Sequence, residues 1–239
     1  MVAQTDEKAQ HPPRVRLNRD RVLRAAVDLA DRDGIDSVSM RNLAEQLGVV
    51  PMALYKHVAN KEELLDGMVD VIVGDFDEPT GATDWKGAVR DRILAARRVL
   101  LRHPWARQVL ESRTSPTPVV LAHLDSLIGI FRAGGFSNDL THHVMHALGS
   151  RMWGFSPELF DDRRTVGPRP VDPEAQVAML QGMAEQYPNI VELSLAAIQA
   201  AGPRASEGCD EQFELEFALD LLLDGFERLH QQGWTSPNT

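Results

Sequence analysis

The chain has 239 residues, of which 43% are hydrophobic and 25% charged, as in an ordinary globular protein. No apolar run reaches the roughly 18 residues that a membrane helix needs, and the start of the chain lacks the apolar core of a signal peptide. We therefore expect a cytoplasmic protein with no membrane partner. The single cysteine, Cys209, excludes an internal disulfide framework.

The net charge of −10 is distributed unevenly. Residues 1–65 contain ten Lys/Arg and ten Asp/Glu, so the whole acidic excess lies in the later part of the chain. A polyanion would therefore be tolerated only at the N-terminal end. This distribution suits nucleic-acid binding but does not establish it, because neutral segments are common.

Nearly every segment repeats apolar residues at intervals of three and four, and the alternation typical of strands is nearly absent. This pattern predicts an all-α fold. Residues 1–17, which include Gln, His and a Pro-Pro pair, are predicted to form a disordered arm. The residues after Trp234 are predicted to be a second disordered end.

Four short helices are predicted at the start of the chain, each bounded by residues that favour helix ends. These helices are predicted to run from Asn18 to Gly34, from Ser39 to Gly48, from Val50 to Val58 with Pro51 in the first turn, and from Asn60 to Asp77. Asn and Ser suit N-caps, glycine suits the left-handed position after a helix, and proline suits the first turn. Glu63 is placed to complete a capping box with Asn60.

A break at Pro79-Thr80-Gly81 separates these helices from a longer set. Residues 161–172 lack periodicity and are predicted to form a mobile loop. The later helices are predicted over residues 84–103, 105–111, 118–134, 137–155, 172–187, 188–201 and 210–232.

The helix that ends at Gly48 and the one over residues 50–58 are joined by a tight turn, which is typical of a helix-turn-helix. In that motif the second helix enters the major groove of DNA with its N-terminal end first. Leu54 and Val58 lie four residues apart and are predicted to face the helices beneath.

The other side chains of this helix are predicted to face outward. Tyr, Lys and His can reach phosphate oxygens, and the Ala53 methyl can touch a thymine methyl. Lys61 begins the next helix, where its ammonium and free backbone N–H groups can clasp one phosphate. Ser39 and Arg41 are placed to contact the DNA backbone or an outer base. The outward-facing residues are Met52, Ala53, Tyr55, Lys56 and His57.

Spacing alone leaves a second interpretation open. Amphipathic helices that end in glycine occur in most all-helical proteins, and a Tyr-Lys-His surface is commonly only solvated. On spacing, DNA binding and an ordinary helical surface explain the segment equally well.

The amino-acid sequence of the segment is more specific than its spacing. The DNA-binding segment of TetR-family transcriptional regulators resembles residues 34–69, GIDSVSMRNLAEQLGVVPMALYKHVANKEELLDGMV. The matching features are Gly34, the turn from Ser39 to Arg41, Leu43-Ala44, Leu47-Gly48-Val49, Leu54-Tyr55, His57-Val58 and Asn60-Lys61.

That resemblance implies a three-helix DNA-binding domain, here residues 18–65, joined by a linker helix to a helical ligand-binding and dimerisation domain, here residues 66–234. It implies a repressor that binds a double-stranded operator. The resemblance implies that Tyr55, His57 and Lys61 contact phosphates. It implies that Arg41, Ala53 and Lys56 contact bases or the groove, and Pro51 and Met52 are further candidates.

The later chain also resembles the C-terminal domain of the family's tetracycline-binding members, through Arg97–His103, Gly134–Phe136 and Glu158 with Gly154. Those members hold the drug as a magnesium chelate with the help of a histidine. The matching position here is Leu110, and Glu158 alone cannot hold the ion. We therefore expect neither a tetracycline–magnesium ligand nor any other cofactor.

A small, largely apolar effector is expected instead, because aromatic and methionine side chains make adaptable pocket walls. Such residues are also ordinary core residues, so both interpretations stand. The candidate effector contacts are Trp105, Leu110, Phe131, Met145, His146, Met152, Trp153 and Met179.

Three histidines, His142, His143 and His146, raise the alternative of a metal site, since the first and third share a helix face. No Glu or Cys stands beside them at metalloenzyme spacing. Histidines at an interface or in a pocket wall are the other interpretation, and no metal is assigned.

A homodimer is expected, because a two-fold pair reads two half-sites about 34–36 Å apart whereas one domain buries too little DNA to be specific. The helices over residues 137–155 and 210–232 can pair with their mates as a four-helix bundle. Phe213, Phe217 and Leu221 are the candidate interface residues, and packing within one chain is the alternative.

Other functions remain to be weighed. An enzyme is not expected, because no nucleophile motif, phosphate-binding glycine loop or metal-ligand set is present in the sequence. A metal-sensing regulator would need the histidine trio to bind ions. A helical adaptor without DNA would be indifferent to the loss of Tyr55 and Lys61.

Overall fold

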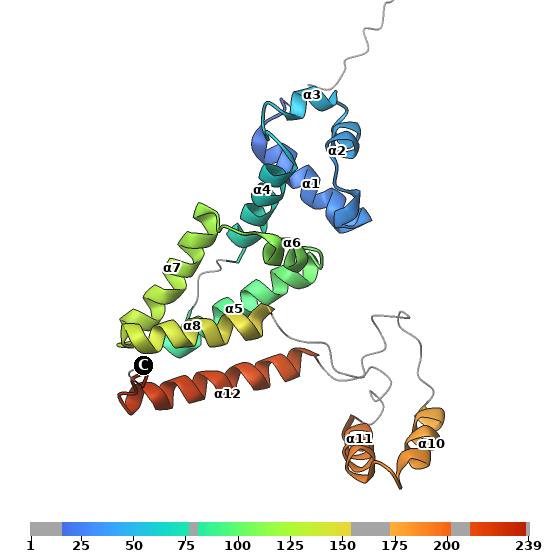
Figure 1. Cartoon of the computed structure of the whole chain (residues 1–239), viewed down its shortest axis with the longest axis vertical. Helices are drawn as coiled ribbons and strands as arrows, with labels where there is room; N and C mark the ends of the chain where they lie inside the picture. Colours follow the sequence, from blue (N-terminus) through green and yellow to red (C-terminus); the bar gives the residue numbers. More distant parts are fainter. Residues whose placement is uncertain (1–15, 77–80, 154–172, 202–210, 238–239) are drawn as a thin grey trace, which may run out of the picture. The chain divides into compact units, whose positions relative to one another are not determined.

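The computed structural model describes residues 16–76, 81–153, 173–201 and 211–237, and within these ranges it contains helices and no strand (Figure 1). The all-α prediction is confirmed. The α-helices are α1 (Arg19–Asp33), α2 (Met40–Leu47), α3 (Pro51–Leu54), α4 (Lys61–Gly74), α5 (Trp85–Arg102), α6 (Ala106–Ser112), α7 (Pro118–Ala133), α8 (Asn138–Trp153), α10 (Pro173–Met183), α11 (Pro188–Ala201) and α12 (Glu211–Gln231), with a 3₁₀ turn at Ile35–Ser37.

The described residues divide into two compact units, one within residues 1–136 and the other within residues 137–239. The first unit holds α1 to α7, and the second holds α8 and α10 to α12. In the described part of the chain, no helix is both long and apolar enough to cross a membrane.

The ends of the first helices are set by the predicted caps. The Asn18 side chain accepts a hydrogen bond from the Arg21 N–H at 2.8 Å, and α1 stops at Gly34 with φ of 82°. Gly48 ends α2 in the left-handed region, with φ of 66° and ψ of 35°. Because only glycine adopts these conformations without strain, both glycines fix where the chain turns.

We call α1 to α4 the head. Its core is made by apolar side chains that are completely or almost completely buried. α4 packs closely on α1, and a Cβ added at Gly67 would lie 2.5 Å from Leu23 Cδ2. The core residues include Val22, Ala26, Val38, Leu43, Leu54, Val58, Leu64 and Met68.

Helix α4 continues from the head to contacts with α5, α6 and α7. The sequence predicted this helix as far as Asp77, whereas it ends at Gly74. The predicted break at residues 79–81 lies mostly outside the described residues. Farther along, the Trp85 ring packs against Phe131 and Phe136 at centroid distances of 5.7 and 4.7 Å.

The stripe of apolar residues along α7 is only partly buried. Leu127 and Phe131 are in the core, whereas Leu121 is 52% exposed. Leu124 and Ile128 are also exposed. The stripe is wider than the surface that the first unit covers, so sequence periodicity located the helix and its core face but not the limits of that face.

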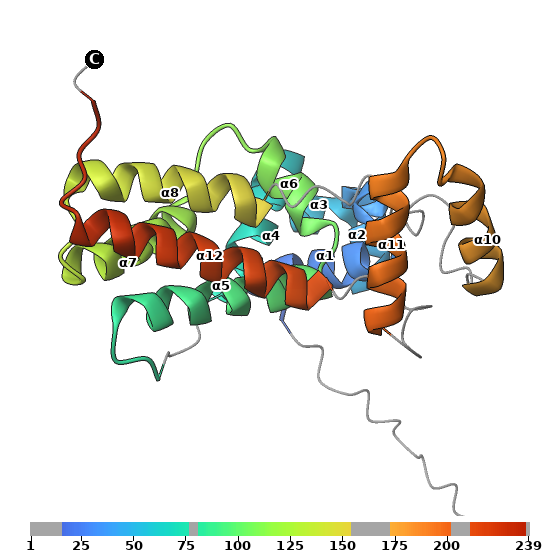
Figure 2. The same ribbon diagram turned by 90° about the horizontal axis from the view of Figure 1, so that it is seen from below.

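In the second unit, α8 and α12 run side by side, and α10 packs on α11 (Figures 1 and 2). The Ser137 hydroxyl oxygen caps α8 by accepting the Leu140 N–H at 3.0 Å. The predicted loop over residues 161–172 lies outside the described residues.

The C-terminal end differs from the sequence prediction. Gly233, with φ of 62°, turns the chain after α12, and Trp234 packs edge-on against His143. The Ser236 N–H and hydroxyl then donate to the Asp139 carboxylate at 2.6 and 2.9 Å. Ser236 is therefore held on α8 by polar contacts, although its neighbours in sequence are typical of disordered ends.

Candidate nucleic-acid interface

The second helix of the predicted helix-turn-helix is shorter than the sequence pattern indicated. It was predicted over residues 50–58, but α3 covers Pro51–Leu54 only. The N–H groups of His57 and Val58 both donate to the Leu54 carbonyl, at 2.8 and 3.0 Å, which closes the helix in a tight turn. The chain must leave the helix here because Asn60, only a few residues on, needs an extended backbone to cap α4.

The two faces of this segment agree with the prediction. Leu54 and Val58 are 0% and 1% exposed and pack into the head. Met52 and Tyr55 are 73% and 46% exposed, and Lys56 is exposed as well. The remaining two, Ala53 and His57, are half-buried. Side chains that can contact a polyanion therefore stand on the side opposite the core.

Helix α2 presents a second part of this surface. The Ser39 hydroxyl oxygen accepts the Asn42 N–H at 3.1 Å, so it caps the helix, while its own O–H remains able to donate to a phosphate. The Asn42 side chain donates to the Ser37 carbonyl at 2.8 Å and braces the preceding turn. Arg41, beside Ser39, is exposed.

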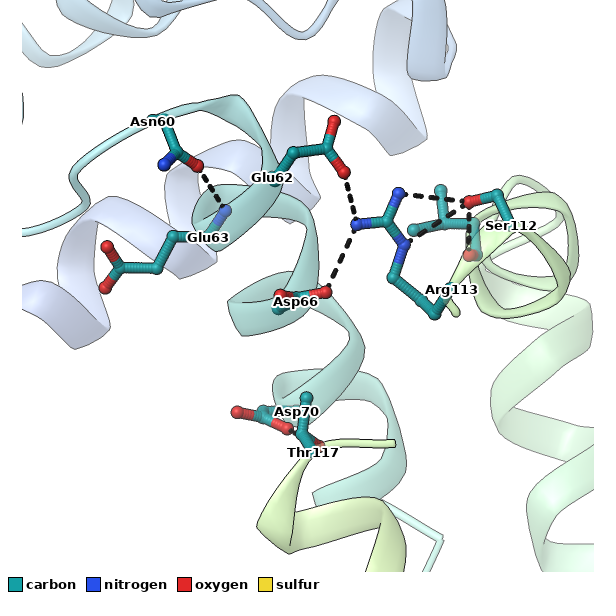
Figure 3. Close-up of polar contacts among 9 residues, drawn as sticks. Asn60, Glu62, Glu63, Asp66, Asp70, Ser112, Arg113 and Thr117 are labelled. Atoms are coloured by element: carbon teal, nitrogen blue, oxygen red, sulfur yellow. Dashed lines mark hydrogen bonds and ion pairs between the residues drawn. The ribbon is translucent and has the colours of Figure 1, made fainter. Parts of the chain in front are cut away.

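The N-terminus of α4 forms a variant of the predicted capping box. The Asn60 side chain accepts the Glu63 N–H at 2.8 Å (Figure 3). The Glu63 carboxylate accepts the N–H of Ala59 at 2.7 Å, one residue before the cap. Lys61 follows the cap and is exposed. The ammonium group thus lies at a helix N-terminus, where the helix dipole favours an anion.

Three cationic side chains of this surface are not neutralised by an acidic residue within the described ranges. Arg41, Lys56 and Lys61 make no ion pair with any residue that the structure describes. By contrast, Arg24 and Arg32 on α1 are paired with Asp20 and Asp33. Cations of this kind beside a protruding helical turn form a surface suited to phosphates.

Polar contacts tie the head to α5, α6 and α7. Arg113, which follows α6, donates to Glu62 at 2.8 Å and to Asp66 at 3.2 Å on α4 (Figure 3). Burial of the guanidinium favours its neutral form, but the hydrogen bonds that it donates to Glu62 and Asp66 outweigh this, so the pKa of Arg113 lies above its ordinary value. One turn farther along α4, Asp70 accepts a hydrogen bond from the Thr117 hydroxyl, which caps α7.

A separate contact reaches α1. The Trp105 indole N–H donates to Asp31 Oδ1 at 2.6 Å, and His103 Nδ1 lies 2.8 Å from the same oxygen. Trp105 is 7% exposed. Sequence reasoning named Trp105 as a candidate effector contact but missed Asp31, His103 and Arg113. The only signal was the acidic spacing at Glu62, Asp66 and Asp70, which is equally typical of a solvated helix face.

The structure places the candidate effector residues in different environments. Trp105 and Phe131 are buried in the first unit, and Leu110 is half-buried there. In the second unit Met145 is half-buried, whereas His146 is exposed and Met179 is 63% exposed. The side chains of Met152 and Trp153, and the whole of Glu158, lie outside the described part.

The histidines of α8 pack edge to face against one another. The ring centroids of His142 and His146 lie 4.6 Å apart, and His143 Nε2 lies 3.6 Å from Asp139 Oδ1. Among the residues that the structure describes, no three His, Cys, Asp or Glu side chains are grouped to hold a metal ion.

The candidate interface residues form a stripe on α12. Phe213, Phe217 and Leu221 are 61%, 55% and 58% exposed. The two phenylalanine rings are stacked, with centroids 6.4 Å apart. The core positions of α12 are occupied by other residues, Leu215, Leu219, Leu223 and Phe226.

Comparison with known proteins links this geometry to a family. Residues 22–68 match the family model described as "Bacterial regulatory proteins, tetR family", and residues 78–230 match "Tetracyclin repressor-like, C-terminal domain". The HTH-type transcriptional repressor DrrR1 of Streptomyces coeruleorubidus is 29% identical over 236 residues, which cover 95% of this chain and 84% of that protein.

Solved structures show the same fold. Apo ActR from Streptomyces coelicolor aligns with a TM-score of 0.69 at 23% identity, covering 92% of this chain and 99% of its own. The complex of ActR with actinorhodin aligns with a TM-score of 0.65 at 25% identity, covering 90% of this chain and 98% of its own.

Proposed function

The chain belongs to the TetR family of DNA-binding transcriptional regulators, and from this premise we propose that it is a repressor that binds a palindromic operator as a homodimer and is released by a small effector. The observation that carries the proposal is the exposed surface of α2, α3 and the start of α4, with cations that have no acidic partner in the described residues. Such a protein acts in the cytoplasm, beside the DNA it controls.

The reading domain is proposed to be residues 18–65, with residues 66–234 as the effector and dimerisation domain. Phosphates are contacted by Tyr55, His57 and Lys61. Bases or the groove are contacted by Arg41, Ala53 and Lys56, flanked by Pro51 and Met52, and Ser39 contacts the backbone through its free O–H.

Dimerisation is proposed to use the exposed stripe of Phe213, Phe217 and Leu221 on α12 together with α8. Large aromatic and leucine side chains that are more than half exposed on one helix face favour burial against a second copy. Two α8–α12 pairs would form a four-helix bundle, which sets the separation of the two heads.

The effector is proposed to be small and largely apolar. The complex of the similar protein ActR with actinorhodin supports a small-molecule effector for this chain. Its contacts would come from the candidate set that includes Trp105, Phe131 and Met145. A ligand that displaces Trp105 would break the hydrogen bond from its indole N–H to Asp31 on α1. The head would then lose one of its contacts with the turn between α5 and α6. A coupling of about 1–3 kcal/mol weakens operator binding by about 5–150-fold.

The first test is fluorescence anisotropy of the full-length protein with labelled duplexes from the DNA that flanks its own gene, across a salt series. We expect tight binding that weakens with salt, and a large loss in a Tyr55→Ala/Lys61→Ala variant. Loss of the Lys61 ammonium should reduce the slope of log affinity against log salt by about 0.9, whereas loss of the uncharged Tyr55 hydroxyl should weaken binding without changing the slope.

Arg102→Ala is the matched control, because it removes one exposed cation from α5, outside the head. Binding that is equal for the double variant and the control would refute the interface. Failure of the wild-type protein to bind the flanking duplexes, or any duplex selected from a random pool, would refute the function itself.

A further inference from the structure

Helix α3, which is proposed to enter the major groove, and the residue before it begin with a run of side chains that contain no nitrogen or oxygen. Residues 50–53 are Val, Pro, Met and Ala, and the next outward-facing residue with a polar atom is Tyr55. Pro51 also lacks a backbone N–H. Direct readout by side-chain hydrogen bonds, such as those of Arg with guanine or Gln with adenine, is therefore impossible for this stretch.

Two of these side chains are exposed to solvent. Val50 is 68% exposed and Met52 is 73% exposed, whereas Leu54 and Val58 fill the core positions of the same segment. Isolated exposed apolar residues are ordinary in proteins. These two, however, flank the N-terminal end of the helix that enters the major groove, and they adjoin Tyr55 and Lys56 of the proposed interface.

We propose that Val50 and Met52 read thymine through its C5-methyl group, so that each operator half-site carries thymine where the start of α3 meets the base pairs. The inference rests on the proposed function, since it needs α3 in the major groove. The thymine methyl is the one apolar group that the base pairs of unmodified DNA present in that groove. Contact with it excludes water from both partners, and cytosine offers no such group.

The two side chains suit the task differently. Val50 is branched at Cβ, so its side chain is stiff and presents methyl groups in a fixed direction. Met52 has a flexible, polarizable thioether that can move to cover a methyl group at a neighbouring step. Arg41, on α2, remains the candidate for readout through hydrogen bonds.

The experiment uses the full-length protein and duplexes that it selects from a random pool. Each thymine of the selected half-site is replaced by uracil opposite the same adenine, which removes only the methyl group. We expect about fourfold weaker binding for each contacted thymine and about 15-fold for two. Where cytosine replaces a contacted thymine and is then methylated at C5, affinity should recover by a similar factor.

Two variants test whether Val50 and Met52 cause the preference for thymine over uracil. Val50→Thr and Met52→Gln keep the approximate shape of each side chain and add polar atoms, so the preference for thymine over uracil should fall toward one. Leu101→Gln, a change at a 57% exposed residue of α5, is the control and should keep the full preference. The preference should not depend on salt, because no phosphate is involved.

Three outcomes would overturn the proposal. Equal binding of thymine and uracil duplexes at every position would do so while leaving DNA binding intact. An unchanged preference in both variants would assign the methyl contact to another residue, such as Ala53. A pool that yields no enriched sequence would show that the head reads no sequence, and Tyr55→Ala/Lys61→Ala would then show whether DNA is bound at all.

Discussion

Replacement of Asp31 by asparagine is expected to loosen the contact between the head and the α5–α6 turn. Asp31 Oδ1 receives the Trp105 indole N–H at 2.6 Å and lies 2.8 Å from His103 Nδ1. The indole nitrogen can only donate, and Nδ1 must donate to a carboxylate. Asparagine offers one oxygen and one NH2 group, so it cannot accept both bonds with the strength of a carboxylate.

The magnitude follows from the exposure of the partners. A hydrogen bond to a charged group contributes about 1.5–3 kcal/mol when it is shielded from water. Here the His103 and Asp31 side chains are 15% and 30% exposed, so water screens part of that energy. We expect Asp31→Asn to lower the free energy of unfolding by about 1–2 kcal/mol. Asp28→Asn, at an exposed position of α1, should change it by less than about 0.5 kcal/mol.

A double-mutant cycle isolates the contact itself. Trp105→Phe removes the N–H but also ring volume, so its single effect mixes the hydrogen bond with packing. Urea unfolding followed by far-UV circular dichroism, on Trp105→Phe, Asp31→Asn and the double variant, should give a coupling of about 1 kcal/mol. A coupling below about 0.3 kcal/mol would show that the contact carries no energy and that Asp31 does not couple the head to the α5–α6 turn.

The remaining predictions concern α4, α8 and α12. Arg113→Met should lower the free energy of unfolding by only about 1 kcal/mol in urea, because Glu62 and Asp66 are 71% and 41% exposed and can rehydrate; a loss above about 3 kcal/mol would contradict this. Phe217→Glu should convert the proposed dimer to monomer in sedimentation velocity, whereas Leu124→Glu on α7 should not; a dimer in both would reject the α12 interface. The hydrogen bonds from the Ser236 backbone and hydroxyl hold the pKa of Asp139 below its ordinary value. The stabilisation that Asp139 provides is therefore fully present above the unfolded-state pKa of about 3.9 and is lost as pH falls through the lower, folded-state value. The difference in melting temperature between wild type and Asp139→Asn should be present from about pH 7 to 5 and shrink as pH falls below about 4, and a difference that does not shrink with falling pH would contradict the assignment.

Local chemistry explains why the helix boundaries were predictable. Asn18, Ser39 and Asn60 each cap a helix through a hydrogen bond that spans three residues, so the signal lies within one window of sequence. The burial of Leu54 and Val58 follows from their four-residue spacing in the same way. The end of α3 was misplaced because two local preferences compete there: apolar spacing favours a longer helix, and the Asn60 cap ends it.

The contacts between the head and the helices α5 to α7 could not be predicted, because their partners are far apart in sequence. Asp31 and Trp105 are separated by 74 positions, and Glu62 and Arg113 by 51. Nothing in a window around Asp31 distinguishes it from the other exposed acids of α1. The same reason applies to Ser236, whose carboxylate partner lies 97 positions away.

The arrangement of these contacts bears on how an effector can move the head. Asp31 lies near the end of α1, whereas Glu62, Asp66 and Asp70 follow one another along α4 (Figure 3). Because α1 and α4 pack closely at Gly67, we expect the two helices to move together. If the head rotates about the contacts on α4, Asp31 moves away from Trp105. If the head instead shifts while Asp31 stays in place, Arg113 separates from α4. The head is therefore held at two points, and loss of one contact should leave much of the restraint. We expect Asp31→Asn and Arg113→Met together to reduce the effector's effect on operator affinity more than the product of the two single reductions, as anisotropy titrations with a fixed effector concentration would measure.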